Sequence, residues 1–494
     1  MSQLWRRKSL AALQDETGDE GHALKKTLGP ANLIALGIGA IIGAGLFVRT
    51  AAAAADSAGP AVTIGFVLAA VGCAFAGLCY AEFASMIPIA GSAYTYSYAT
   101  MGELMAWIIG WDLVLEYGIG AATVSIAWSE YLNKLLAFLP GGHQIPFQWC
   151  HSPFQSMTDA SGAVVHGIMN VPALFVVLAL SLLLIRGMKE SAFVNGLIVI
   201  TKVAIVIMII VLGWGFIDPA NHTPYIPEPT TIKDAAGVEH SFGGFRGIVG
   251  AAGTVFFAFI GFDAVSTAAQ ETVNPKRDMP IGILGSLAVC TVLYILFAHV
   301  LTGIAPYTEF RGEGREASVA YAITHHMAGH DWLAKLVTVA ILAGFSSVIL
   351  VMLMGQSRVF FSMSRDGLVP AVFSDVHPRF RTPYKSNLVF FGFVGVFAAF
   401  VPGDVVGDMT SIGTLFAFVL VCVGVWVLRV RDPGAPRAFR APLVPIVPIL
   451  GIAANTLMIF GLGWTNWARL GVWLAIGLAI YFLYSRHHSR LKHP

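Results

Sequence analysis

The chain contains few charged residues and few cysteines. Asp, Glu, Lys and Arg together make up 12% of its 494 residues, whereas hydrophobic residues make up 56%. The mean hydropathy of +0.73 excludes a soluble globular domain. The 5 cysteines show no CxxC spacing and the histidines show no metal-ligand spacing, so we expect neither a disulfide framework nor a metal site. Because no nucleophile motif accompanies the acidic residues, we do not expect an enzyme.

Long apolar windows run through almost the whole chain. Windows of about 20 apolar residues predict membrane-spanning helices. Since backbone groups in lipid must bond within their own segment, the predicted fold class is an all-α membrane bundle. We expect twelve transmembrane helices, which begin near Leu33, Ile64, Leu104, Asn170, Phe193, Phe245, Gly282, Leu333, Asn387, Met409, Leu443 and Ala468.

Charge fixes the expected topology. Residues 1–31 lack the apolar core and cleavage site of a secretory signal and are expected to form a cytoplasmic tail. Most of the 30 Lys and Arg residues fall on the same side of the predicted spans as this tail, which places both termini in the cytoplasm. The net charge of +2 does not indicate nucleic-acid binding, and the basic tail 486–494 is expected to rest on anionic lipid headgroups.

The segment "GIGAIIGAGLFV", residues 37–48, places four glycines inside the first predicted span. Glycine is a poor helix former, so the segment needs an explanation. Gly39 and Gly43 lie four residues apart, as in a helix-packing face. Alternatively, the helix unwinds in the middle of the membrane, where its free backbone groups would line a cavity and meet a polar ligand.

The sixth predicted span shows a similar interruption. It is rich in glycine and is broken near its middle by "FIGFD", residues 259–263. Five spans separate the two interruptions, and an odd offset makes the second copy enter the membrane from the opposite side. The pattern predicts two inverted repeats, residues 32–217 (helices 1–5) and 243–430 (helices 6–10), followed by two extra helices in residues 441–485.

Four motifs resemble a known family. They are the glycine segment above, "CYAEFASMIPIAGSAYTYSYATMGELMAWIIGWDLVLEY", "FFAFIGFDAVSTAAQETVNPKRDMPIGI" and "QSRVFFSMSRDGLVP". In this order they resemble the amino acid, polyamine and organocation superfamily, in particular bacterial homologues of the cationic amino acid transporters. The resemblance implies the leucine-transporter fold, an L-amino acid substrate and the plasma (inner) membrane of a bacterium. It implies no cofactor other than H⁺ as the coupling ion.

The resemblance also implies a substrate site made of backbone groups. An α-amino acid carries a carboxylate and an ammonium, and both need hydrogen-bonding partners when they are buried. By similarity to the family, the carboxylate would meet the amides of Gly43, Ala44 and Gly45. The ammonium would meet the carbonyls of Ile41, Phe256, Ala258 and Phe259, and Ile260 is a further candidate for substrate binding.

Lys202 lies about nine residues inside its predicted span, too deep for its side chain to reach the interface easily. Snorkelling towards the interface remains the alternative. In similar family members a lysine replaces a bound sodium ion and converts sodium coupling to proton coupling. By this resemblance, protonated Lys202 would bridge the Gly39–Ile42 carbonyl region and the serine pair Ser346 and Ser347.

Several further residues are candidates for the pocket and its gate. Glu116 and Asp263 are expected to sense a cationic side chain or to relay the proton, unless they only satisfy backbone or neighbouring helices. Met352 would shape the side-chain pocket and favour small or mid-sized amino acids, with Tyr117 as a polar lining residue. Glu82 and Asp366 are expected in an inner gate with turns at Pro88 and Gly91.

These features predict a secondary active transporter that imports L-amino acids with protons by alternating access. An amino acid exchanger without obligatory proton coupling is the alternative. A channel would need a continuous polar pore, which the few charged residues within the spans do not supply. The sequence leaves open whether the substrate is neutral or cationic, and which oligomer forms.

Overall fold

The chain folds into a bundle of helices. The computed structural model describes residues 3–8, 28–87, 92–159, 162–187, 192–233, 239–311, 315 and 317–490. Pro88 and Gly91, for which turns at the inner gate were predicted, lie outside these residues. Within the described chain the only strands form two short antiparallel hairpins, which the sequence analysis did not predict: β1 (Ser156–Thr158) with β2 (Val164–His166), and β3 (Thr230–Lys233) with β4 (Glu239–Phe242).

The α-helices vary from single turns to a helix of 35 residues. In chain order they are α2 (Pro30–Ile41), α3 (Thr50–Ala53), α4 (Val62–Met86), α5 (Ser92–Thr100), α6 (Glu103–Leu113), α7 (Gly120–Phe138), α8 (Val171–Ile185), α9 (Ala192–Gly213), α10 (Gly244–Val255), α11 (Pro275–Ile304), α12 (Ser318–His326), α13 (Asp331–Arg365), α14 (Tyr384–Phe400), α15 (Gly403–Arg431), α16 (Ile446–Gly461), α17 (Trp464–Ile480) and α18 (Arg486–His488).

Most of the bundle is apolar enough to cross a membrane. Eight helical stretches of the described chain have the length and composition of a membrane span, and α2, α8, α14 and α16 are shorter apolar helices. Large hydrophobic side chains point outwards from these helices, for example Ile200 and Val211 of α9, which are 67% and 66% exposed. Such a surface is expected where lipid is the solvent.

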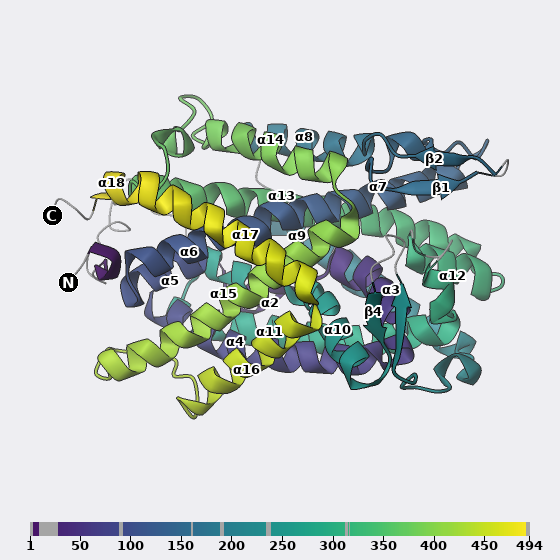
Figure 1. The fold of residues 1–494 in the computed structure, drawn as a ribbon, viewed down its shortest axis with the longest axis horizontal. Coiled ribbons are helices and arrows are strands. Elements are labelled where there is room, and N and C mark those ends of the chain that lie inside the picture. The colour runs from purple at the N-terminus through teal and green to yellow at the C-terminus, as the bar shows by residue number, and fades with distance from the viewer. Residues whose placement is uncertain are drawn as a thin grey trace.

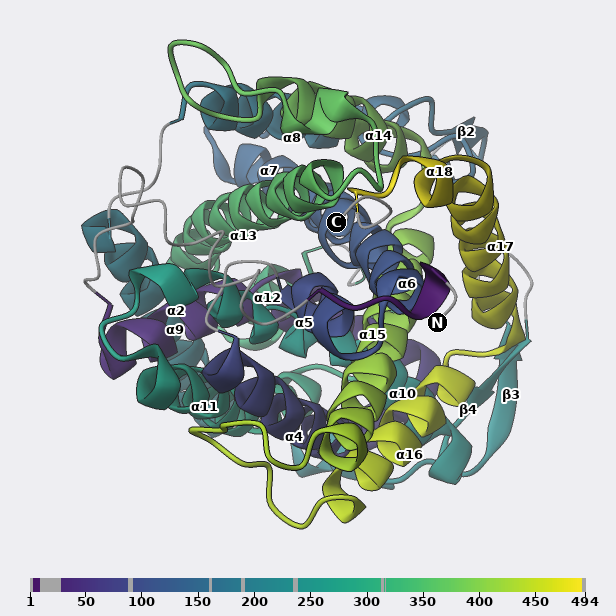
Figure 2. The same ribbon diagram turned by 90° about the vertical axis from the view of Figure 1, so that its left-hand side faces the viewer.

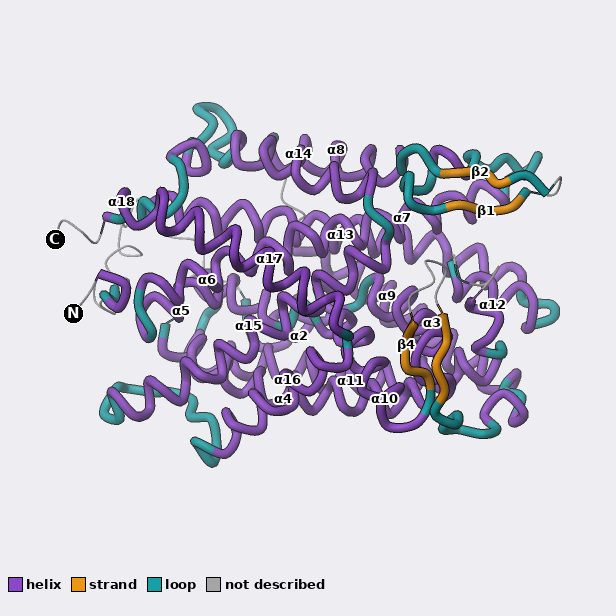
Figure 3. Tube along the Cα trace, in the orientation of Figure 1, coloured by secondary structure: helices purple, strands orange, loops and turns teal. Residues whose placement is uncertain are grey.

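The long helices run roughly between two ends of the molecule (Figure 1). The described chain ends meet at one of them, where the Lys8 side chain donates to the Asp366 carboxylate and the Arg490 amide donates to the Asp366 carbonyl. Both hairpins lie at the opposite end (Figure 3). In the view along the bundle, α8 pairs with α14 at one edge, and α4 packs against α11 at the other (Figure 2).

Several elements depart from regular α-helix inside the bundle. The chain leaves α2 at Ile41 and resumes in a π-helical stretch, Gly45–Arg49. Another π-helical stretch, Val114–Ile119, joins α6 to α7. After α10 comes a 3-10 turn, Phe256–Phe259, and beyond a short break a second 3-10 stretch, Asp263–Glu271. Irregular helix of this kind is frequent at functional sites.

A buried carboxylate organises the end of the bundle where the chain ends meet. Glu82 of α4 is fully buried and accepts hydrogen bonds from Arg429 Nε (2.9 Å) and Nη2 (2.8 Å) and from Arg437 Nε (3.0 Å). The amide of Ala441 adds a fourth bond of 2.8 Å. One side chain therefore ties the end of α4 to α15 and to the loop that precedes α16.

We predict that Glu82→Gln destabilises the protein by about 3 kcal/mol, because it leaves two arginines without a buried countercharge. Reversible unfolding in detergent measures this loss. Asp375→Asn is the matched control: the Asp375–Lys385 pair is about half exposed and should contribute less than about 1 kcal/mol. Equal losses in the two variants would contradict the assigned role of Glu82.

Candidate functional site

The first interruption exposes peptide groups in the centre of the bundle. Ile42 ends α2 in an extended conformation with ψ of 103°. Among the backbone hydrogen bonds of the described residues, none has the amide of Gly43, Ala44 or Gly45 as its donor. These three amides precede a helical stretch, and the N-terminal end of a helix favours a negatively charged group. The segment has the donors that a carboxylate needs.

The second interruption follows the 3-10 turn Phe256–Phe259. Ile260 is extended, with ψ of 133°, and Gly261 has φ of +114°. Residues with a side chain rarely adopt that conformation. An added Cβ at Gly261 would also come within 2.9 Å of the carbonyl of Ala40, so the glycine allows the second break to approach the last turn of α2.

The two interruptions touch each other. An added Cβ at Gly45 would lie 2.2 Å from Cα and 2.5 Å from the amide nitrogen of Ala258. Two explanations were given for the glycines of this segment, a helix-packing face and an unwound stretch that meets a polar ligand. At Gly45 the close neighbour is the backbone of Ala258.

Tyr294 of α11, which no sequence motif identified as a site residue, links the same two segments. Its hydroxyl lies 3.0 Å from the carbonyl oxygen of Ile41 and 3.0 Å from that of Ala258. Both carbonyls were predicted to meet a substrate ammonium. The hydroxyl therefore lies where such an ammonium would bind. No sequence spacing connects residue 294 with residues 41 and 258, so only the fold reveals this contact.

Lys202 of α9 reaches the last full turn of α2. Its side chain is buried, and Nζ donates to the carbonyl of Gly39 at 2.8 Å. The stem passes directly over Gly344 of α13, where an added Cβ would lie 2.8 Å from Lys202 Cε. The lysine thus joins α9, α2 and α13 at a point three residues before the first break.

The two serines of the pair on α13 differ in burial: Ser346 is partly exposed and Ser347 is buried. Ser346 donates to the carbonyl of Leu342 at 2.9 Å, one turn earlier, and accepts from Trp128 Nε1 at 3.1 Å. The residue after the pair, Val348, faces the first break, with its methyl group 3.3 Å from the position of an added Cβ at Gly43.

Met352 lies one turn further along α13 than Val348. It is close to Gly120 of α7, where an added Cβ would lie 3.3 Å from the Met352 sulfur. Aromatic rings close the space on the side of the second break. Phe256 packs edge-on against Phe418 with ring centroids 5.4 Å apart, and Phe259 packs against Tyr294 at the same distance. The side chains that pack around the two breaks are therefore largely apolar.

Glu116 and Asp263 form a pair of buried carboxyl groups. Both are fully buried, and Asp263 Oδ2 accepts a bond of 3.0 Å from the Tyr117 hydroxyl. In the described structure neither carboxyl oxygen of Glu116 has a hydrogen-bond partner. Oδ1 of Asp263 has none either. The two carboxyl groups lie close to each other, so the pair is a candidate proton site.

Ionic contacts lie beyond the site on both sides. Arg49, four residues after Gly45, pairs with Asp408 of α15, and Asn466 of α17 also donates to this carboxylate at 3.1 Å. At the other end Asp366 binds Lys8 Nζ at 2.8 Å and the Tyr94 hydroxyl at 2.7 Å. The sequence predicted an inner gate that includes Asp366. It identified neither Lys8 as the partner of Asp366 nor Asp408 as the partner of Arg49.

The structure is an apolar helical bundle that contains two interrupted helices, a buried lysine and buried carboxyl groups. These features are typical of a membrane transporter. Residues 28–480 match the profile of the family described as "Amino acid permease", and the chain belongs to this family. It is a transporter of the amino acid, polyamine and organocation superfamily and not an enzyme, as the motifs predicted.

Three relatives show the range of this family. The chain is 45% identical to the branched-chain amino acid permease BcaP of Bacillus subtilis, with 99% of each chain covered. It is 40% identical to the methylthioribose transporter of the same organism, over the full length of both. It is 34% identical to the vacuolar cationic amino acid transporter 4 of Arabidopsis thaliana. The aligned region covers 88% of this chain and 69% of that protein.

We predict that Gly45→Ala disrupts the contact between the two breaks. The new methyl group would overlap backbone atoms of Ala258, which cannot move aside as a side chain can, so destabilisation of about 1–3 kcal/mol and loss of uptake are expected. Gly355→Ala is the control, because an added Cβ there meets only Tyr117 at 3.6 Å. Unfolding in detergent and uptake into proteoliposomes measure both effects. Full uptake by Gly45→Ala would show that the contact is dispensable.

Proposed function

We propose that this chain is a secondary active transporter that moves L-amino acids by alternating access and couples their uptake to protons. The observation that carries the proposal is the bond between Lys202 Nζ and the Gly39 carbonyl at 2.8 Å. It joins a buried titratable group to the helix whose interruption supplies free amides. Substrate and proton would then act on the same segment.

Recognition of the amino acid uses the backbone of both interruptions. The substrate carboxylate binds the amides of Gly43, Ala44 and Gly45, which have no backbone acceptor in the described structure. The ammonium binds carbonyls at the 3-10 turn Phe256–Phe259 and at Ile41. Because the Tyr294 hydroxyl lies 3.0 Å from the carbonyls of Ile41 and Ala258, substrate and tyrosine compete for the same oxygens. Binding therefore changes the link between α11 and the two breaks.

Proton coupling uses Lys202. When it is protonated, its charge strengthens the bond to the Gly39 carbonyl and holds the last turn of α2 against α9. Loss of the proton weakens this bond and releases α2, which opens a path to the site. Ser346 and Ser347 lie on the helix over which the lysine stem passes. Glu116 and Asp263 hold a second titratable position, which can relay a proton.

The arrangement of the chain supports a more detailed topology. We infer twelve spans in the leucine-transporter fold, with inverted repeats in residues 32–217 and 243–430 and two further helices in residues 441–485. The two interrupted segments, which occupy equivalent positions in these repeats and touch at Gly45 and Ala258, support the inference. The excess of basic residues at one end supports cytoplasmic termini in the plasma membrane of a bacterium.

We infer that the substrate is a neutral aliphatic amino acid of moderate size. Val348, Met352 and the rings of Phe256 and Phe259 form apolar walls near the breaks. The full-length likeness to a branched-chain amino acid permease supports the same class.

We predict that Lys202→Ala abolishes accumulation driven by a pH gradient, because no titratable group then joins α9 to α2. Purified protein in liposomes, given labelled leucine and an inward proton gradient, tests this. Counterflow of leucine at equal pH should remain measurable. Thr201→Ala is the control, since Thr201 is exposed and bonds only within its own helix at Leu197.

Undiminished gradient-driven uptake by Lys202→Ala would remove this residue from the coupling mechanism. Counterflow by the unmodified protein with no response of net uptake to pH would instead identify an exchanger. Loss of counterflow as well as accumulation in the variant, with normal folding, would assign Lys202 to substrate binding.

We predict that unlabelled leucine, isoleucine and valine compete with labelled leucine at least tenfold better than arginine does. Methylthioribose should compete weakly, because it offers neither a carboxylate to the free amides nor an ammonium to the carbonyls. Inhibition constants from uptake into proteoliposomes measure this order. Stronger inhibition by arginine or methylthioribose than by leucine would contradict the proposed substrate class.

A further inference from the structure

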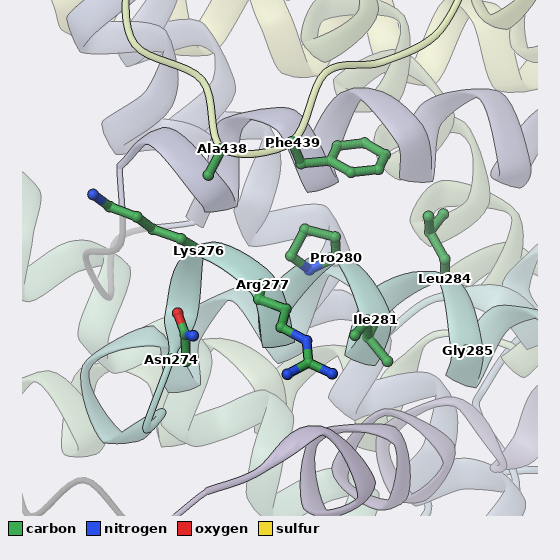
Figure 4. A pocket seen from close by; sticks show the side chains of 9 residues that line it. All are labelled: Asn274, Lys276, Arg277, Pro280, Ile281, Leu284, Gly285, Ala438 and Phe439. Atoms are coloured by element: carbon green, nitrogen blue, oxygen red, sulfur yellow. The ribbon is translucent and has the colours of Figure 1, made fainter.

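A groove of about 800 Å³ lies apart from the central site, over the first turns of α11. Its other wall is the loop that precedes α16, and Figure 4 shows Phe439 of this loop across from Pro280 and Leu284 of α11. The loop is held in place by the Glu82 network and by the amide of Phe439, which donates to Ser85 at 3.2 Å. The lining residues are Asn274, Lys276, Arg277, Pro280, Ile281, Leu284, Gly285, Ala438 and Phe439.

The lining has an apolar part and a cationic part. Pro280, Ile281, Leu284 and Phe439 form the apolar part, and Lys276 and Arg277 extend from the first turn of α11 (Figure 4). Both cationic side chains are exposed, and neither forms an ion pair with the described residues. None of the described residues that line the groove is acidic. Its charge therefore complements an anion that carries an apolar body.

The apolar part continues along α11 towards the middle of the bundle. Ile281, Val292 and Leu296 are 39%, 59% and 36% exposed on the outer surface of the helix. From Ile281 to Val292 the helix rises about 16 Å, roughly half the thickness of the hydrocarbon layer. The groove thus opens onto a surface that faces lipid, at the end of the bundle where the described chain ends lie (Figure 1).

We propose that this groove binds one anionic glycerophospholipid from the adjacent leaflet. The phosphate lies near Lys276 and Arg277, and an acyl chain follows Ile281 and Leu284 along α11. A soluble anion would use only the cationic part and leave the apolar part in water. The proposal concerns binding alone, so it stands or falls separately from the proposed transport function.

The position of the groove gives the lipid a contact with the moving part of the proposed mechanism. Gly285, which lines the groove, packs against Ile34 of α2, where an added Cβ would lie 2.9 Å from Cδ1. One turn earlier Gly282 packs against Leu33. A lipid in the groove therefore borders the junction between α11 and α2.

Native mass spectrometry of the delipidated full-length protein tests the site. Palmitoyl-oleoyl phosphatidylglycerol is added and compared with phosphatidylcholine that has the same chains. We expect phosphatidylglycerol to bind more tightly, and Lys276→Gln with Arg277→Gln to weaken its binding by about fivefold for each cation removed. Ala438→Trp should weaken binding by filling the groove while it leaves both cations in place.

Arg186→Gln with Arg431→Gln is the matched control, since both arginines are exposed and neither lines the groove. This double variant should bind phosphatidylglycerol as the unmodified protein does. An equal loss of phosphatidylglycerol binding in the control variant would show that binding depends only on general surface charge, and it would overturn the proposal. Equal binding of phosphatidylcholine, or complete competition by water-soluble glycerophosphoglycerol, would also overturn it.

Discussion

Two helices stop in the middle of an apolar bundle, and the peptide groups that they free must find partners there. Unpaired peptide groups are unfavourable in such surroundings. Part of the need is met internally, because the Tyr294 hydroxyl lies between the carbonyls of Ile41 and Ala258. The amides of Gly43, Ala44 and Gly45 have no backbone acceptor in the described structure. The site therefore offers more free amide donors than free carbonyl acceptors. This suits a ligand that carries a carboxylate and an ammonium in the same molecule.

The rest of the bundle holds these segments in contact. Gly45 and Gly261 permit backbone contacts that any side chain would prevent. Lys202 ties the turn before the first break to α9. Beyond the site, Arg49 with Asp408 and Lys8 with Asp366 connect elements distant in sequence at the two ends. A protein that opens alternately at either end has to break such contacts in turn.

The sequence predicted the positions of the interruptions because glycine and the run of apolar residues are local signals. The structure ends α2 at Ile41 and places a positive φ at Gly261, both inside the predicted segments. Lys202 could also be selected from sequence, since a lysine deep in an apolar helix is rare. Its bond to the Gly39 carbonyl depends on how α9 packs, which sequence spacing does not encode.

Other parts of the site could not be predicted from one sequence. Tyr294 and Val348 sit on regular helices among other apolar residues, and only packing shows that they face the breaks. Val348 lies one helical turn from the predicted Met352, and its position beside Gly43 depends on the rotation of α13 about its axis, which the neighbouring helices set. The partners Lys8 and Asp408 lie 358 and 359 residues from the groups they bind, beyond any local pattern.

The most direct measurement is an experimental structure of the full-length protein with L-leucine bound. The account predicts the leucine carboxylate within hydrogen-bonding distance of the amides of Gly43, Ala44 and Gly45. It also predicts the ammonium at the carbonyls beside the second break, with the Tyr294 hydroxyl displaced from at least one of them. Leucine bound elsewhere, or bound with both helices continuous through residues 42–45 and 260–262, would contradict it.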